Sequence, residues 1–231
     1  MRDYKILAPL VNSRRIERFS SILQKRTKWI TVVLDDFYHR HNMSAVIRSA
    51  EAFGIQDVHV AEISNPFKPS KGVALGTEQW ITLFKYPSVE DCIKSLRQRG
   101  YKLFCANPPP LRNDSTSRSC YSVDSLPIET KVAVIFGREL DGLHKEFLEQ
   151  SDGTFFIPMK GLAESLNVSV CAGITLYELR KRMEIEIDER QWRLSYKEKE
   201  ELLGRWILNS VRHGPAVFEE IEKRMKTNKK E

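Results

Sequence analysis

The sequence predicts an α/β protein with a mostly parallel sheet and helices on both faces. Short runs rich in Val, Ile and Phe alternate along the chain with longer segments whose apolar residues recur at helical spacing. This alternation is typical of parallel sheets, because a helix returns the chain to the end of the sheet where the next strand begins. The apolar fraction of 41% is sufficient for a core. No run of about 18 apolar residues occurs in the sequence, so no membrane span is expected.

The alternating part covers residues 29–183, which we expect to form the central domain. Its strands are predicted at Ile30–Leu34, Val58–Ala61, Ile81–Phe84, Lys102–Ala106, Val132–Phe136 and Thr154–Ile157. Its helices are predicted at Asn42–Phe53, Val89–Gln98, Leu140–Glu149 and Ser165–Met183. The segment from Pro108 to Ser125 is polar and rich in turn residues, which predicts a loop.

Helical extensions are predicted on both sides of the central domain. Residues 1–28 contain apolar side chains at helical spacing with arginines around them, which indicates a basic amphipathic helix. Residues 184–231 contain a further helix around Trp206, and Pro215 suits the first turn of a last one.

Basic residues gather at both ends of the chain. Residues 1–30 alone carry a net charge equal to the formal charge of +6 of the whole chain, and the last eleven residues are also basic. This distribution favours a phosphate-rich partner such as nucleic acid, although a solubilising surface is the alternative interpretation. The four cysteines are scattered without a Cys-x-x-Cys pair, and the histidines form no metal-ligand set. We therefore expect reduced thiols, no metal and a cytoplasmic protein.

The first candidate site lies on the helix predicted from Asn42. One face of this helix is apolar, and Arg48 points to the opposite side. The helical neighbours of Arg48 are small, so a ligand or another chain can approach its guanidinium closely. In the alternative interpretation, Arg48 is a surface arginine paired with Glu51, and Asn42 only caps the helix.

Two further candidates follow predicted strands. Gly137 comes directly after a strand, where a ligand can approach the backbone, and Glu139 suits the start of the next helix. Pro158 ends the following strand because it cannot donate a hydrogen bond, and Ser165 and Asn167 suit a helix start. No Gly-x-Gly-x-x-Gly follows a strand, and the sequence has no Walker A motif and no Gly-x-Ser-x-Gly. Dinucleotide binding and a Gly-rich methyltransferase loop are therefore not indicated.

The three candidates occur together and in this order, and the combination resembles the three motifs of the SpoU/TrmH branch of the SPOUT methyltransferases. The matching segments are Asn42…Arg48…Gly54, Phe136-Gly137-Arg138-Glu139-Leu140-Asp141-Gly142 and Ile157-Pro158-Met159…Ser165-Leu166-Asn167-Val168-Ser169. The resemblance covers residues 12–183. It implies a C-terminal deep trefoil knot, which general topology rules would not predict. It also implies bound S-adenosyl-L-methionine and a homodimer formed through the Ser165–Met183 helix.

The resemblance also implies roles for individual residues. Arg48 matches the catalytic arginine of the family, and the other matching active-site residues are Asn42, Glu139, Ser165 and Asn167. The residues that match or adjoin cofactor-contacting positions are Ala106, Asn107, Gly137, Ile157 and Leu166. The expected tRNA contacts are Arg14, Arg15 and Arg18 in the N-terminal helix, together with the Lys-rich tail.

The implied reaction is 2′-O-methylation of a ribose in tRNA. The basic N-terminal helix and the C-terminal helices suit the subgroup that modifies guanosine 18 of the D-loop. Another tRNA or ribosomal-RNA ribose is the alternative substrate, and a non-catalytic RNA-binding protein on the same scaffold is the alternative from a different class. Two roles stay open for Arg48. It is either deprotonated with help from an RNA phosphate, or it stays charged, grips that phosphate and stabilises the developing oxyanion.

Overall fold

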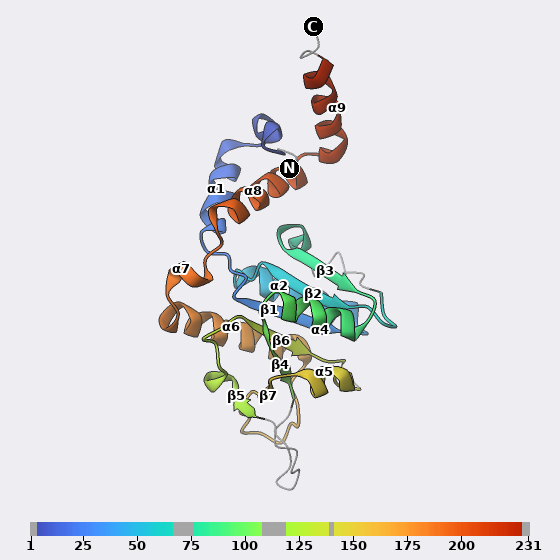
Figure 1. Ribbon diagram of the computed structural model, residues 1–231, viewed down its shortest axis with the longest axis vertical. Helices are drawn as coiled ribbons and strands as arrows, with labels where there is room; N and C mark the ends of the chain where they lie inside the picture. Colours follow the sequence, from blue (N-terminus) through green and yellow to red (C-terminus); the bar gives the residue numbers. More distant parts are fainter. Residues whose placement is uncertain (1–3, 67–75, 108–118, 139–140, 228–231) are drawn as a thin grey trace. The chain divides into compact units, whose positions relative to one another are not determined.

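The computed structural model describes residues 4–66, 76–107, 119–138 and 141–227, which belong to two compact units (Figure 1). The larger unit spans Thr27–Trp192. The smaller unit combines Met1–Arg26 with Arg193–Glu231. The two ends of the chain therefore contribute to the same unit.

The larger unit is built on a seven-stranded sheet in the order β3-β2-β1-β6-β4-β7-β5, and every pairing between these strands is parallel. The strands are β1 (Ile30–Asp35), β2 (Asp57–Ala61), β3 (Thr82–Tyr86), β4 (Lys102–Ala106), β5 (Cys120–Ser122), β6 (Val132–Phe136) and β7 (Gly153–Phe156). This architecture confirms the mostly parallel α/β sheet predicted from the alternating pattern. The carboxyl ends of the strands consequently meet along one edge of the sheet.

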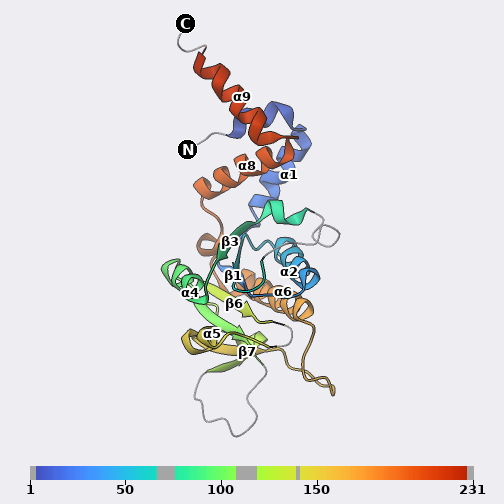
Figure 2. The ribbon, with the colours of Figure 1, turned by 90° about the vertical axis from the view of Figure 1, so that its right-hand side faces the viewer.

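Helices cover both faces of the sheet, and each face has its own hydrophobic core. Helices α2 (Arg40–Ala52) and α6 (Val168–Glu186) lie on one face, and α4 (Val89–Gln98) and α5 (Lys145–Gln150) lie on the other (Figure 2). The side chains of β1 alternate between the two cores, as expected for a strand buried on both sides. Val32 and Leu34 pack with α2 and α6, whereas Val33 packs with α4 and α5. The described part of this unit also contains the short helical segments η2 (Thr77–Trp80), η3 (Val123–Ser125) and α7 (Glu189–Trp192).

Strand β5 corrects the prediction of a loop from Pro108 to Ser125. Residues 108–118 lie outside the described part, but Cys120–Ser122 pairs in parallel with β7, and η3 follows it directly. All three residues of β5 are partly exposed. So short an edge strand has no room for an alternating pattern, which is why the sequence does not reveal it.

Two predicted helices begin later than the sequence suggests. Helix α5 begins at Lys145 rather than Leu140, because the chain first makes a turn that closes at Gly142, whose φ is +68°. Helix α6 begins at Val168 rather than Ser165. Asn167 is its N-cap residue, and its side-chain oxygen accepts from the backbone N–H of Ser169 at 2.9 Å.

The smaller unit is helical. It contains η1 (Tyr4–Leu10), α1 (Ser13–Leu23), α8 (Tyr196–Ser210) and α9 (Gly214–Thr227). Leu7, Ile207 and Phe218 form its core, and the Arg26 guanidinium lies 5.2 Å from the centre of the Trp206 ring. These elements confirm the amphipathic helix predicted within residues 1–28 and the helix predicted around Trp206. The short helix η1 was not expected from the sequence. No helix in the described part of the chain is long and apolar enough to cross a membrane.

Candidate active site

A cavity of about 590 Å³ opens at the carboxyl edge of the sheet in the larger unit. Its walls come from the ends of β4, β6 and β7 and from the segment that leads into α6. A cavity of this size is typical of sites for drug-sized ligands and cofactors. Its lining includes seven of the residues singled out in the sequence: Ala106, Asn107, Gly137, Ile157, Ser165, Leu166 and Asn167.

A close backbone contact explains why position 137, at the end of β6, is a glycine. A Cβ atom at this position would lie 2.6 Å from the carbonyl carbon of Gly142 and 2.7 Å from the nitrogen of Leu143. The chain turns back over Gly137 through a short antiparallel bridge, in which Arg138 N donates to Gly142 O at 2.9 Å. Any side chain here would displace this loop and change the wall of the cavity.

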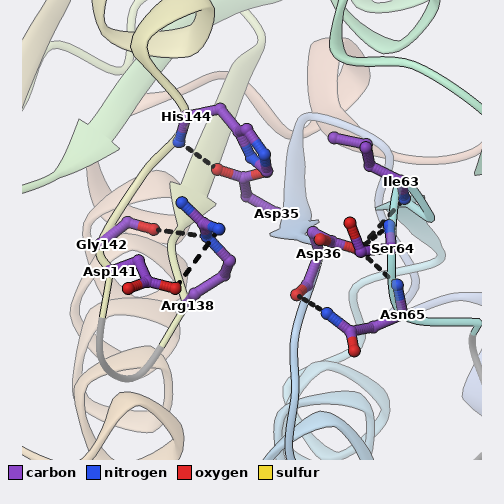
Figure 3. Close-up of polar contacts among 9 residues, drawn as sticks. All are labelled: Asp35, Asp36, Ile63, Ser64, Asn65, Arg138, Asp141, Gly142 and His144. Atoms are coloured by element: carbon purple, nitrogen blue, oxygen red, sulfur yellow. Dashed lines mark hydrogen bonds and ion pairs between the residues drawn. The ribbon is translucent and has the colours of Figure 1, made fainter.

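The loop after β6 is also anchored at its far end. The backbone N–H of His144 donates to Oδ2 of Asp35 at 2.7 Å, and Nδ1 of His144 lies 2.6 Å from Oδ1 of the same carboxylate (Figure 3). Asp35 is fully buried at the end of β1. Burial raises the pKa of Asp35, while the hydrogen bonds from His144 and the charge of Arg138 oppose this shift. The backbone N–H bond favours the ionised carboxylate, as does the ring contact in the tautomer that carries its proton on Nδ1.

Asn42 and Asn167 connect the first and third motifs. The side-chain amide of Asn167 donates to the side-chain oxygen of Asn42 at 3.2 Å. The oxygen of Asn167 meanwhile caps α6 and accepts from Ser169 Oγ at 2.6 Å. Asn42 lies within α2, whose N-cap is His39, so the interpretation of Asn42 as only a helix cap is wrong.

Arg48 lies on the exposed side of α2, as the helical spacing predicts. The opposite side of α2 carries Met43, Val46 and Ala50, which are buried in the core shared with α6. Within the described part of the chain, Arg48 has no hydrogen-bond or ion-pair partner. It does not line the cavity, so the structure does not bring it together with the cofactor positions.

The remaining predicted residues have different outcomes. Glu139 and Leu140 lie outside the described residues, as do Lys229 and Lys230 of the basic tail. Arg14, Arg15 and Arg18 are exposed on α1 in the smaller unit, where Phe19 and Leu23 turn inward. This arrangement confirms the amphipathic character of the N-terminal helix. The roles of all these residues stay predictions.

Sequence reasoning assigned no role to several residues that shape the cavity, although Arg138 and Met159 lie within the matching motifs. Arg138, Leu143, Met159, Glu164 and Cys171 line it, and Asp35 and His144 fix one of its loops. One signal was present for Asp35. The adjacent carboxylates Asp35 and Asp36 come directly after the predicted strand Ile30–Leu34, whose residues are all apolar or Thr. Burial raises the pKa of the Cys171 thiol to about 11, so this residue forms an apolar part of the wall at neutral pH.

The fold and the cavity define a class of protein: an α/β protein that binds a small ligand where its parallel strands end. Among the described residues, no group of His, Cys, Asp and Glu is arranged to hold a metal ion. Comparison with known proteins narrows this class. The model of the family described as SpoU rRNA methylase matches residues 29–177, and the chain belongs to this family.

Individual relatives agree with the family. A tRNA (guanosine(18)-2′-O)-methyltransferase from Borreliella burgdorferi is 34% identical over 178 residues, covering 77% of this chain and 78% of the relative. An enzyme of the same name from Thermus thermophilus is 30% identical, covering 84% of this chain and 95% of the relative. The crystal structure of the TrmH/SpoU tRNA modifying enzyme of A. aeolicus is similar with a TM-score of 0.74 and 26% identity, covering 86% and 98% of the two chains.

Proposed function

We propose that this protein is an S-adenosylmethionine-dependent tRNA methyltransferase that modifies the ribose 2′-oxygen of guanosine 18. The observation that carries the proposal is the convergence of the second and third motifs on one cavity, with the first motif joined to them through Asn42 and Asn167. Relatives that carry this activity cover most of the chain. A non-catalytic RNA-binding protein would not require such a set of joined polar residues beside a cavity.

The residues around the cavity fit S-adenosylmethionine. The absent Cβ of Gly137 lets the backbone of Gly142 and Leu143 pack against it, and all three residues line the cavity. Ile157 and Leu166 supply apolar walls. Asn107, Ser165 and Asn167 add polar groups at the same cavity. When bound, the cofactor supplies a methyl group on a positively charged sulfur. The chain contributes the shape of the cavity, and Ala106, Asn107, Gly137, Ile157 and Leu166 would hold the cofactor.

Arg48 would act on the RNA side of the reaction. A ribose hydroxyl is a weak nucleophile until it loses its proton, so the protein must accept that proton or stabilise the negative oxygen. A guanidinium remains protonated at ordinary pH, and Arg48 is exposed on α2, where an RNA phosphate can reach it. We therefore favour the second role, in which charged Arg48 grips an RNA phosphate and stabilises the developing oxyanion. Asn42, Glu139, Ser165 and Asn167 would complete the active site.

The basic N-terminal helix would bind tRNA. Arg14, Arg15 and Arg18 are exposed on α1, where they can contact phosphates without reading the base sequence. We assign the chemistry to residues 29–183 and the additional RNA contacts to the extensions 1–28 and 184–231. A tRNA substrate also agrees with a cytoplasmic location.

The family resemblance adds a homodimer and a trefoil knot to the proposal. Val170, Ile174 and Tyr177 are exposed at helical spacing on α6, and such an apolar face suits a second copy of the chain. Ala172 of the same helix is buried within its own unit, so it is not part of this exposed face. The insertion of β6 between β1 and β4, and of β7 between β4 and β5, supports a threaded C-terminal part.

Methyl transfer from labelled S-adenosylmethionine tests the proposed function. The protein should label unmodified tRNA transcripts and leave ribosomal-RNA fragments unlabelled. Labelling of ribosomal RNA alone would favour the alternative substrate. Cofactor binding without transfer to any RNA would favour the non-catalytic alternative.

A further inference from the structure

The buried carboxylate of Asp35 has no role in the chemistry described above. Its side chain is fully buried at the end of β1, in the middle of the sheet. Burying an ionised carboxylate is unfavourable unless its oxygens accept hydrogen bonds, and here both oxygens are held by His144. Such a pair is weak evidence for stability, because an apolar residue of similar size can pack at lower cost. A role in fixing geometry explains it better.

The geometry that Asp35 fixes is that of the cavity loop, whose described residues are 137–138 and 141–144. Gly137, Arg138, Gly142 and Leu143 line the cavity, and His144 is the last residue before α5. The first residue of the loop continues β6, while the last is held by Asp35 across 109 positions of sequence (Figure 3). The described part between them closes on itself through the Arg138–Gly142 bridge. The anchor at His144 therefore restrains the described end of the loop, residues 141–144, at the wall of the cavity.

We propose that Asp35 and His144 are positioning residues for cofactor binding, which set the path of the cavity loop and thereby the affinity for S-adenosylmethionine. This inference rests on the proposed function. Neither residue touches the cofactor in this account, since neither lines the cavity. Arg138 assists the pair, because its positive charge favours the ionised form of Asp35 that accepts both bonds. Arg138 is itself restrained by Asp141, with Nη1 and Oδ2 at 3.4 Å.

The neighbouring carboxylate provides a matched comparison. Asp36 is also buried, and its Oδ1 accepts the backbone N–H groups of Ile63, Ser64 and Asn65 at 3.1, 2.9 and 2.8 Å (Figure 3). Its φ of +49° is unusual for a residue with a side chain. Asp36 therefore holds a different loop, whose described residues 62–66 do not line the cavity. Comparing the Asp35–His144 contact with Asp36 therefore distinguishes an effect on cofactor binding from a general effect of loosening a loop.

The test compares His144→Ala, His144→Asn and Asp36→Ala with the unchanged protein. Calorimetric titration measures the Kd for S-adenosylmethionine, thermal unfolding measures stability, and steady-state kinetics separate kcat from the KM for tRNA. His144→Ala should raise the Kd about tenfold, the size expected for loss of one hydrogen bond to a charged group, with little change in the KM for tRNA. His144→Asn keeps a donor near the position of Nδ1 and should return the Kd to within about threefold of the original. Asp36→Ala should lower the Tm without changing the Kd.

An unchanged Kd for folded His144→Ala would overturn the inference, as would a failure of His144→Asn to improve on alanine. An equal rise of the Kd in Asp36→Ala would also overturn it, because general loosening of the fold would then explain the effect. If the unchanged protein bound S-adenosylmethionine and methylated tRNA in these cases, the proposed function would stand. If it bound no S-adenosylmethionine at all, the proposed function itself would fail.

Discussion

The amide of Asn167 donates to the side-chain oxygen of Asn42 at 3.2 Å, which joins two helices across 125 positions of sequence. The same side chain caps α6 through its oxygen. One residue therefore determines both where the last helix of the site begins and how it meets α2.

Asn167→Asp separates capping from the connection to Asn42. An aspartate can still accept from Ser169, so the cap and the Tm should be kept, but it cannot donate to Asn42. We expect methyl transfer to fall at least about tenfold because a charge-bearing group replaces the donor. Asn167→Ala should in addition lose about 1 kcal/mol of unfolding free energy through loss of the cap. Full activity in a stable Asn167→Asp protein would contradict the role of the pair.

Gly137→Ala tests the close approach at the end of β6. The added methyl group would meet the backbone of Gly142 and Leu143 at less than 3 Å, which forces the loop away from its position. Binding of S-adenosylmethionine, measured by calorimetry, should weaken strongly or disappear. Gly161→Ala is the matched control, because no atom lies within 4 Å of its new Cβ. Equal binding by both variants would mean that the loop position is unimportant.

Arg48→Lys tests whether the role of Arg48 is specific to its guanidinium. Lysine keeps the positive charge but not the planar, forked set of donors. We expect a large loss of kcat with an unchanged Kd for S-adenosylmethionine, because Arg48 does not line the cavity. Arg190→Lys, at an exposed arginine on α7, is the control and should behave as the original protein. A rate preserved near neutral pH in Arg48→Lys would exclude any role specific to the guanidinium.

Replacing Arg14, Arg15 and Arg18 together with glutamine tests the RNA surface on α1. Three lost phosphate contacts should weaken tRNA binding and reduce the slope of log K against log salt by about 2. Binding of S-adenosylmethionine should not change, since its cavity lies in the other unit. Unchanged tRNA affinity at moderate salt would remove this helix from the interface.

The buried His59 should make the free energy of unfolding depend on pH. Burial lowers its pKa to about 3, with a smaller contribution from the charge of Arg99. Between pH 6.5 and about 3 the unfolded chain binds a proton at His59 that the folded chain does not, so acid favours unfolding in this range. Replacement by phenylalanine should reduce the loss of unfolding free energy between pH 7 and pH 5 by about 2 kcal/mol. His213→Asn, at an exposed position, is the control, and an equal pH slope in all three proteins would refute the assignment.

The sequence predicted most of the larger unit because local patterns decide its elements. The strands near Val32 and Val134 are short apolar runs, and α4 carries an apolar face with Ser88 as its cap, so pattern and structure agree. The edge strand β5 and the late start of α5 depend instead on pairing with β7 and on the turn at Gly142. Neither leaves a periodic signal.

The candidate site shows the same division. Gly137, Ser165 and Asn167 belong to recognisable motifs beside strand ends, and the structure brings them to one cavity. The contact between Asp35 and His144 joins positions 109 residues apart and involves no motif. Long-range polar contacts of this kind follow from the order of the strands, which the sequence pattern alone does not determine.

The central claim is transfer of a methyl group to the 2′-oxygen of guanosine 18, and a pair of tRNA transcripts tests it most directly. One transcript is unmodified, and the other carries 2′-deoxyguanosine at position 18 only. We predict that labelled S-adenosylmethionine transfers its methyl group to the first, with the label mapped to the ribose of guanosine 18, and not to the second. Equal labelling of both transcripts, or of neither, would contradict the account.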